Sequence, residues 1–220
     1  MATLLLRLAA PLQAWGAESK FETRRTEKMP TKSGVVGLLA AALGRKRYEA
    51  VDDLAALRFG VRIDQEGVII KDFQTAKSVK ASYITYRFYI SDAVFLVGLE
   101  SEDAEWLSQL EKALSNPVFP LFLGRRACTP SLPLVLGIVD KPLVDALRDT
   151  EWQASEVYQR KHPSASLQIF ADALDGENGG LMRDVPVSFN PERREFTWRR
   201  VHEHDSVRVG TDEHDPMLEL

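Results

Sequence analysis

The chain has 220 residues, of which 45% are hydrophobic, and its formal net charge is −4 at pH 7. This length is enough to bury a core in one large domain or two small ones, and the charge excludes a protein coated all over in positive charge. Any nucleic-acid surface must therefore be a local patch of Lys and Arg. The single Cys128 excludes an internal disulfide and a Cys-based zinc site. It fits a reducing compartment, and we expect the cytoplasm.

An apolar run at residues 3–9 (TLLLRLA) predicts a buried first strand. Arg7 interrupts the apolar N-terminus and no run approaches the length of a membrane span, so we expect neither a signal peptide nor a transmembrane segment. A long connection follows at residues 13–29 and carries Arg24 and Arg25. A connection of this length inside a compact domain usually has a function.

Residues 33–43 predict a short buried helix, with Ser33 as N-cap and Gly44 as the left-handed residue after its end. Its free backbone N–H groups, the missing Cβ of Gly34 and the cation of Lys32 make a place where a phosphate can bind. A nucleotide P-loop is rejected, because its glycines must precede the Lys-Ser pair. A capped core helix without a ligand stays an open alternative.

The amino-acid composition changes between residues 64 and 92, where β-forming and aromatic residues alternate with cations. We expect a β-hairpin or flap that projects from the domain. Strands at 58–63, 93–99 and 134–139 and a helix ending at residue 114 complete the order strand, helix, strand, strand, helix, strand. That order predicts an α+β class with a ferredoxin-like split βαβ domain rather than a doubly wound parallel sheet.

After residue 140 the composition turns polar. A short helix at 142–148 is followed by a set of candidate strands, at residues 155–161, 166–173, 185–189, 194–202 and 206–209. The GENGG stretch at 176–180 predicts a loop. We therefore expect a ferredoxin-like domain over residues 1–140 and a small β-rich region with an acidic tail over residues 141–220.

The sequence gives little support for a catalytic or metal-binding site. His202 and His204 would share one face of a strand beside Asp205, but no further ligand follows at a suitable spacing, so solvated surface histidines are the better interpretation. Neither a carboxylate pair nor a nucleophile with a nearby His-Asp arrangement stands out. We expect no catalytic residue, no metal and no cofactor.

RNA binding has more support, because cations recur beside aromatic residues or glycines in three places. These are Arg24 and Arg25 before the PTKSG motif, Tyr83, Tyr86 and Arg87 in the flap, and Gly124, Arg125 and Arg126 in FLGRR. Arg and Lys neutralise phosphate, while aromatic rings stack on bases. Each cluster alone is better explained as a hairpin or a turn. Three of them in an acidic chain favour a confined RNA-contacting surface.

Five motifs, in this order, resemble the Cas five family of CRISPR Cascade subunits. They are LLRLAAPLQAWG at 5–16, PTKSGVVGLLAAALG at 30–44, RFGVRID at 58–64, RFYISDAVF at 87–95 and FLGRRACTPSLPLVLG at 122–137, with ERREFTWRR at 192–200 as a weak extension. The resemblance implies an RRM-like RAMP fold with a protruding thumb at about residues 72–91. It also implies a non-catalytic subunit of the type I-E Cascade complex that holds the 5′ handle of the mature CRISPR RNA (crRNA). Implied partners are the Cas seven backbone subunits, the large subunit that recognises the PAM and, only through the complex, target DNA; no membrane is involved.

The resemblance also implies which residues contact RNA. These are Arg24, Arg25, Thr31, Lys32, Ser33, Gly34, Lys77, Lys80, Tyr83, Tyr86, Arg87, Phe122, Arg125 and Arg126. Relatives can carry Tyr where this chain has Phe122, so a possible proton-transfer hydroxyl is absent there. The alternative is a metal-independent endoribonuclease that cuts CRISPR repeat RNA with Lys80, Tyr83 and Tyr86. A protein-interaction module without RNA contact is a third possibility.

Overall fold

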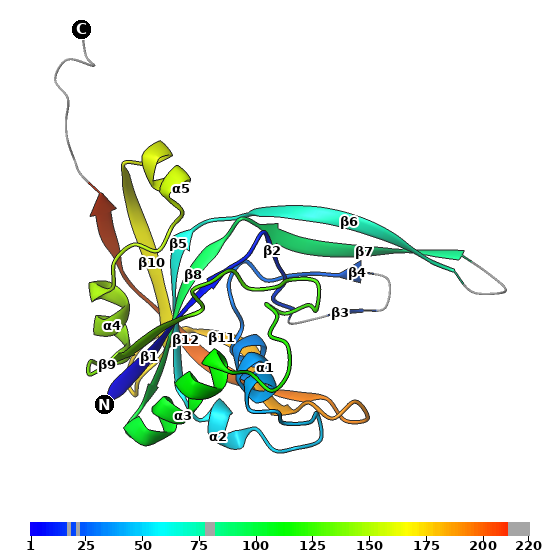
Figure 1. The fold of residues 1–220 in the computed structure, drawn as a ribbon, viewed down its shortest axis with the longest axis horizontal. Helices are drawn as coiled ribbons and strands as arrows, with labels where there is room; N and C mark the ends of the chain where they lie inside the picture. Colours follow the sequence, from blue (N-terminus) through cyan, green and yellow to red (C-terminus); the bar gives the residue numbers. More distant parts are fainter. Residues whose placement is uncertain (17–18, 21–22, 78–81, 211–220) are drawn as a thin grey trace, which may run out of the picture.

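The structure is a computed structural model that describes residues 1–16, 19–20, 23–77 and 82–210 (Figure 1). The fold is of the predicted α+β class, with mostly antiparallel sheets and few helices. The predictions for Lys80 and for the tail at 211–220 lie outside the described residues. None of the described helices is long and apolar enough to cross a membrane.

The strands and helices have the following bounds. The strands are β1 (Ala2–Ala9), β2 (Leu12–Gln13), β3 (Ser19–Lys20), β4 (Thr23–Arg24), β5 (Arg58–Gln65), β6 (Val68–Lys77), β7 (Ser82–Ser91), β8 (Val94–Ser101), β9 (Val135–Val139), β10 (Ser164–Asp172), β11 (Gly180–Ser188) and β12 (Glu195–Gly210). The helices are α1 (Lys32–Ala42), α2 (Asp52–Ala55), α3 (Ala104–Ser115), α4 (Leu143–Asp149) and α5 (Glu156–Lys161).

The main sheet has the strand order β11-β12-β10-β5-β8-β1-β9 in the described part of the chain, and its neighbouring strands are antiparallel. Along the chain, β1, α1, β5, β8, α3 and β9 follow one another in the predicted sequence of strands and helices. The hairpin of β6 and β7 is inserted between β5 and β8.

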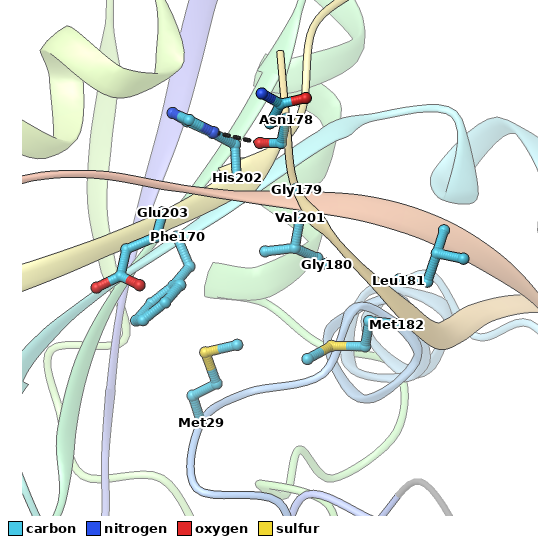
Figure 2. A pocket seen from close by; sticks show the side chains of 10 residues that line it. All are labelled: Met29, Phe170, Asn178, Gly179, Gly180, Leu181, Met182, Val201, His202 and Glu203. Atoms are coloured by element: carbon cyan, nitrogen blue, oxygen red, sulfur yellow. Dashed lines mark hydrogen bonds between the residues drawn. The ribbon is translucent and has the colours of Figure 1, made fainter.

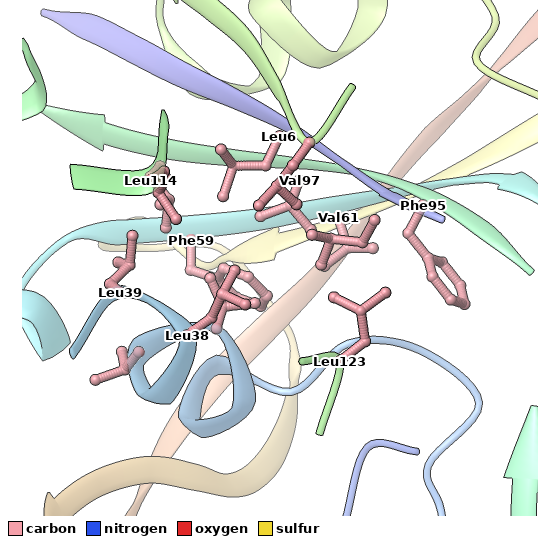
Figure 3. Close-up of a cluster of buried hydrophobic side chains, with 14 of the residues drawn as sticks. Leu6, Leu38, Leu39, Phe59, Val61, Phe95, Val97, Leu114 and Leu123 are labelled. Carbon is pink, nitrogen blue, oxygen red and sulfur yellow. The ribbon is translucent and has the colours of Figure 1, made fainter. Parts of the chain in front are cut away.

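Hydrophobic side chains are buried on both faces of this sheet. Successive side chains of a strand point to opposite faces, so β1 contributes to both clusters. Leu6 of β1 faces α1 and α3, where it packs in the larger cluster of buried side chains (Figure 3). Leu5 faces the other way and packs against Leu143 and Leu147 of α4. Helices on both faces explain why β1 is an almost continuous apolar run.

Residues after 140 continue the main sheet, because β10 pairs with β5. Arg62 of β5, which is fully buried, also links the residues after 140 to the main sheet. Its guanidinium forms two hydrogen bonds with Asp64 (2.7 and 2.8 Å) and donates to the carbonyls of Thr150 (2.6 Å) and Glu151 (2.8 Å). The boundary predicted at residue 140 stays a prediction.

The second sheet is built around β7. Its neighbours are β6 on one side and β2 and β4 on the other, with β4 parallel to it. The β6–β7 hairpin runs in unbroken register from Val68 opposite Ser91 to Lys77 opposite Ser82, and it extends away from the main sheet (Figure 1). This pair of strands lies within residues 64–92, where the hairpin was expected.

Two element predictions in the C-terminal region are wrong. Residues 155–161 form α5 instead of a strand, because the Ser155 hydroxyl caps the helix by accepting from the Tyr158 N–H, and Tyr158 stacks on His162 one turn later with ring centroids 4.0 Å apart. The two strands expected at 194–202 and 206–209 are one strand, β12, whose register with β10 shifts between Leu167 and Ile169.

Candidate nucleic-acid interface

The N-terminus of α1 is capped by Thr31, so the expectation of Ser33 as N-cap is wrong. Thr31 has extended backbone angles, φ −89° and ψ 148°, and its hydroxyl accepts a hydrogen bond from the Gly34 N–H at 3.3 Å. The Val35 N–H donates to the Thr31 carbonyl at 3.1 Å. The expectation of free N–H groups is therefore also wrong for Gly34 and Val35.

The space that Gly34 leaves is filled by protein. A Cβ at this position would lie 2.7 Å from Cε3 of Trp15, and the Trp15 ring is buried. The backbone of Trp15 also holds the loop that precedes α1. Its N–H donates to the Thr26 hydroxyl at 2.8 Å, and its carbonyl accepts from the Glu27 N–H at 2.6 Å. Gly34 thus lets a core aromatic residue support the segment that carries Arg24 and Arg25.

Lys32 is 7% exposed and is paired with carboxylates of the C-terminal strands. Its N–H donates to Asp184 at 2.8 Å, and its ammonium lies 2.9 Å from Asp172. A carboxylate of the chain itself therefore sits at the helix N-terminus where a phosphate was expected. The side chains of Thr31, Lys32 and Ser33 are all buried.

Arg199 of β12 completes this arrangement. It forms hydrogen bonds with Asp184 (2.6 and 2.9 Å) and with Asp172 (2.7 Å). Burial lowers the pKa of the Arg199 guanidinium, but the hydrogen bonds and negative charges of the two aspartates outweigh burial and leave that pKa above its ordinary value. Lys32, Asp172, Asp184 and Arg199, the buried charge network, join α1 to β10, β11 and β12.

The structure brings together predicted arginines from three separate segments. Arg24 of β4 lies opposite Arg87 of β7 in a parallel register. The Arg125 guanidinium donates to the carbonyl of Arg24 at 2.9 Å and to that of Arg25 at 3.4 Å. Arg126, the next residue, is exposed. We call Arg24, Arg25, Arg87, Arg125 and Arg126 the arginine cluster.

No member of the arginine cluster forms a salt bridge within the described part of the chain, although Asp72 of β6 lies opposite Arg87 in the hairpin register. The Nε atom of Arg87 and the Nη1 atom of Arg125 are shielded from water and have no hydrogen-bond acceptor among the described residues. Buried donors are normally paired, so these two nitrogens are unsatisfied hydrogen-bond donors.

The predicted hairpin residues lie on two faces, because opposite residues of an antiparallel pair share a face. Phe73 and Lys77 of β6 share one face with Tyr86, while Tyr83 and Arg87 lie on the other. Phe73 and Tyr83 are strongly exposed, at 68% and 60%. The hairpin therefore offers a flat aromatic surface on each side.

Two residues beside these positions were not among the predicted RNA contacts. The ammonium of Lys71 lies 4.0 Å from the ring centroid of Tyr86, and the Arg125 guanidinium lies 4.6 Å from that of Tyr89. Alternation along β6 places Lys71 on the face of Phe73 and would have found it. Tyr89 is buried, and its contact joins β7 to a loop distant in sequence, so only the fold reveals it. Phe122 is half-buried at the start of the loop that carries Arg125.

Comparison with known proteins gives a consistent result. Residues 3–202 match the model of the family described as CRISPR-associated protein (Cas_Cas5). The chain is 36% identical, over an alignment of 160 residues, to the CRISPR system Cascade subunit CasD of Escherichia coli (strain K12), an alignment that covers 61% of this chain and 70% of that protein.

Two solved structures share the fold over nearly the whole chain. One is the crystal structure of a Cas protein, with 45% identity, a TM-score of 0.73 and coverage of 92% of this chain and 94% of that one. The other is a chain of a CRISPR RNA-guided surveillance complex, with 29% identity, a TM-score of 0.78 and coverage of 94% and 91%.

Proposed function

The chain belongs to the Cas5 family of CRISPR-associated proteins, and we propose that it is a non-catalytic subunit of a type I-E Cascade complex that holds the 5′ handle of crRNA. Its similarity to a chain of an RNA-guided surveillance complex supports this role. In the proposal it acts in the prokaryotic cytoplasm.

The observation that carries the proposal is the arginine cluster. Five cations from three segments converge without a salt bridge among the described residues, although the chain as a whole is acidic. Guanidinium groups bind phosphate oxygens well, so a phosphate backbone is a suitable partner for such a local concentration of positive charge. Tyr83, Tyr86 and Lys77 on the hairpin extend the surface with rings for base stacking and a further cation.

The residues at the start of α1 take a supporting part in this proposal. Thr31, Lys32 and Ser33 are buried, and Gly34 packs on Trp15, whose backbone holds the loop of Arg24 and Arg25. We therefore assign this segment to positioning the arginine cluster instead of lining the handle directly.

The finer fold assignment also belongs to the proposal. The strand order β9-β1-β8-β5, with α1 and α3 as the two crossovers, supports a ferredoxin-like RAMP domain. The β6–β7 hairpin corresponds to the thumb. Its exposed apolar side chains, among them Val68, Ile69 and Ile84, support contact with Cas seven backbone subunits and the large PAM-recognising subunit. Target DNA would be reached only through the complex.

The test is incubation of the purified chain with end-labelled CRISPR repeat RNA in EDTA, read on a native and a denaturing gel. We expect a shifted, intact RNA whose affinity falls as salt rises. Arg125→Ala should weaken binding and reduce the salt slope by about 1. Arg193→Ala is the matched control, because Arg193 is exposed and paired with Glu195 at 3.3 Å, outside the arginine cluster.

Two other outcomes would overturn the proposal. Discrete cutting of the repeat in EDTA, abolished by Tyr86→Phe, would make the chain a metal-independent endoribonuclease. An absence of RNA binding together with normal assembly of the Arg125→Ala variant into the complex would make it a protein-interaction module.

A further inference from the structure

The loop between β10 and β11 folds back onto β12. Gly176 allows the turn, with a φ of +90°, and Gly179 allows close approach, because a Cβ there would lie 2.3 Å from the Val201 carbonyl oxygen. The GENGG stretch thereby places Glu177 and Asn178 over β12. This is a second region of interest, separate in sequence from the arginine cluster.

His202 and His204 lie on the same face of β12, with ring centroids 4.6 Å apart. The Nδ1 of His202 is 2.5 Å from the backbone carbonyl of Asn178 (Figure 2). A carbonyl only accepts, so Nδ1 carries a proton, and in the neutral imidazole Nε2 is then the nitrogen with a lone pair to offer. Donation of the second ring nitrogen to a carbonyl is the arrangement that metal-binding histidines usually show.

Glu177 supplies a third group, which the spacing in the sequence did not reveal. Its Oε2 accepts from the Leu174 N–H at 2.7 Å, so the side chain is held in place. One ligand atom each from Glu177, His202 and His204 lie within 4.8 Å of one another. The Nε2 of His204 is shielded from water and has no hydrogen-bond partner among the described residues.

Charged groups surround these three side chains. Burial, followed by the neighbouring His202, lowers the pKa of His204, although Glu177 opposes the shift. The hydrogen bond from the Leu174 N–H lowers the pKa of Glu177. Arg58 of β5 and Arg148 of α4 are the nearby cations that also act on His204, and Arg58 is itself paired with Glu100 at 3.4 Å.

We propose that Glu177, His202 and His204 bind one first-row divalent transition-metal ion, with Zn²⁺ as the expected occupant. Two imidazoles and one carboxylate suit such an ion and not Mg²⁺ or Ca²⁺, which prefer oxygen ligands. Tetrahedral Zn²⁺ would draw the ligand atoms to about 3.3 Å from one another, a small closure that the surface loop of Glu177 can make. Water takes the fourth position, and the ion ties the β10–β11 loop to β12.

The test uses the full chain without an affinity tag, stripped with EDTA and dialysed. Titration with Co²⁺ should produce a visible absorption band that saturates at one equivalent, and Zn²⁺ should abolish it. Zn²⁺ should also raise the melting temperature, because it binds the folded state. His202→Gln and His204→Gln should each weaken Co²⁺ binding by about 10-fold or more, because even the loss of an outer-shell partner of a metal ligand typically costs that much.

His162→Gln is the matched control, because His162 stacks on Tyr158 in α5, away from the three ligands, and it should bind as the wild type does. Should a β12 variant fail to fold, Glu177→Gln on the exposed loop decides the question by the same titration. Absence of a saturable band in the wild type, or wild-type affinity in a His202→Gln/His204→Gln double variant, would overturn the site.

Discussion

The indole ring of Trp15 occupies the space that a side chain at Gly34 would need, with Cε3 2.7 Å and Cζ3 2.9 Å from the position of a Cβ. We therefore expect Gly34→Ala to destabilise the fold by about 1–3 kcal/mol, the usual cost of overpacking a filled core. Urea unfolding followed by circular dichroism measures this difference. Displacement of Trp15 would also disturb the loop of Arg24 and Arg25, so RNA affinity should fall as well.

Gly37→Ala provides the control in the same helix. A Cβ at Gly37 meets only Phe189 Cζ at 3.8 Å, an ordinary contact, and Ala is favoured over Gly inside a helix by up to about 1 kcal/mol. The two variants should therefore change stability in opposite directions. Equal effects would show that Trp15 does not exclude a side chain at position 34.

Asp184 is 1% exposed and accepts hydrogen bonds from both the Lys32 N–H and Arg199. Asp184→Asn removes the charge that compensates Arg199 and leaves the buried charge network with an excess cation. We expect a loss of about 3–5 kcal/mol, as for other broken buried ion pairs. The measurement is the urea concentration at the midpoint of unfolding, compared between variants whose unfolding free energy depends equally on urea concentration.

Asp149→Asn is the comparison for Asp184→Asn. Asp149 pairs with Lys141 at 2.7 Å, but the two side chains are 57% and 50% exposed. An exposed pair of this kind contributes at most about 1 kcal/mol. A loss from Asp149→Asn as large as that from Asp184→Asn would contradict the role given to burial.

Tyr86 is expected to stack on a base of the bound RNA. Tyr86→Ala should lower affinity by about 5- to 150-fold, which corresponds to 1–3 kcal/mol per stacked base, while Tyr86→Phe keeps the ring and should bind normally. Filter binding with handle RNA measures both. Tyr48→Ala removes another exposed aromatic residue, between α1 and α2, and should have no effect.

Cys128 reports on the loop of Arg125. The thiol is 1% exposed, burial raises its pKa, and the Cys128 N–H donates to the Arg125 carbonyl at 2.8 Å. Iodoacetamide at pH 8 should therefore alkylate the folded chain at least about 100-fold more slowly than the urea-unfolded chain, because the loop must open first. Mass spectrometry over time measures the two rates. A fast reaction in the folded state would mean that this loop opens readily.

Local patterns predicted much of the fold. The alternation and end signals of β1, β5, β8 and α3 are properties of neighbouring residues, and the structure confirms these elements to within a few residues. The strand prediction for residues 155–161 was wrong, because the Ser155 cap and the Tyr158–His162 stack favour a helix there in spite of a strand-like composition. The three arginine-bearing segments were also visible, because a cation beside an aromatic residue is a local feature.

The sequence by itself therefore determined the class of fold, the family and the segments that carry positive charge. Only the tertiary structure decided which groups meet. It placed Asp184 at the N-terminus of α1, set Arg125 on Tyr89 and brought Glu177 to His202 and His204. The physical reason is that burial and ion pairing depend on partners far along the chain, as for Lys32 and Asp184, which are 152 residues apart. Local patterns carry no information about such partners.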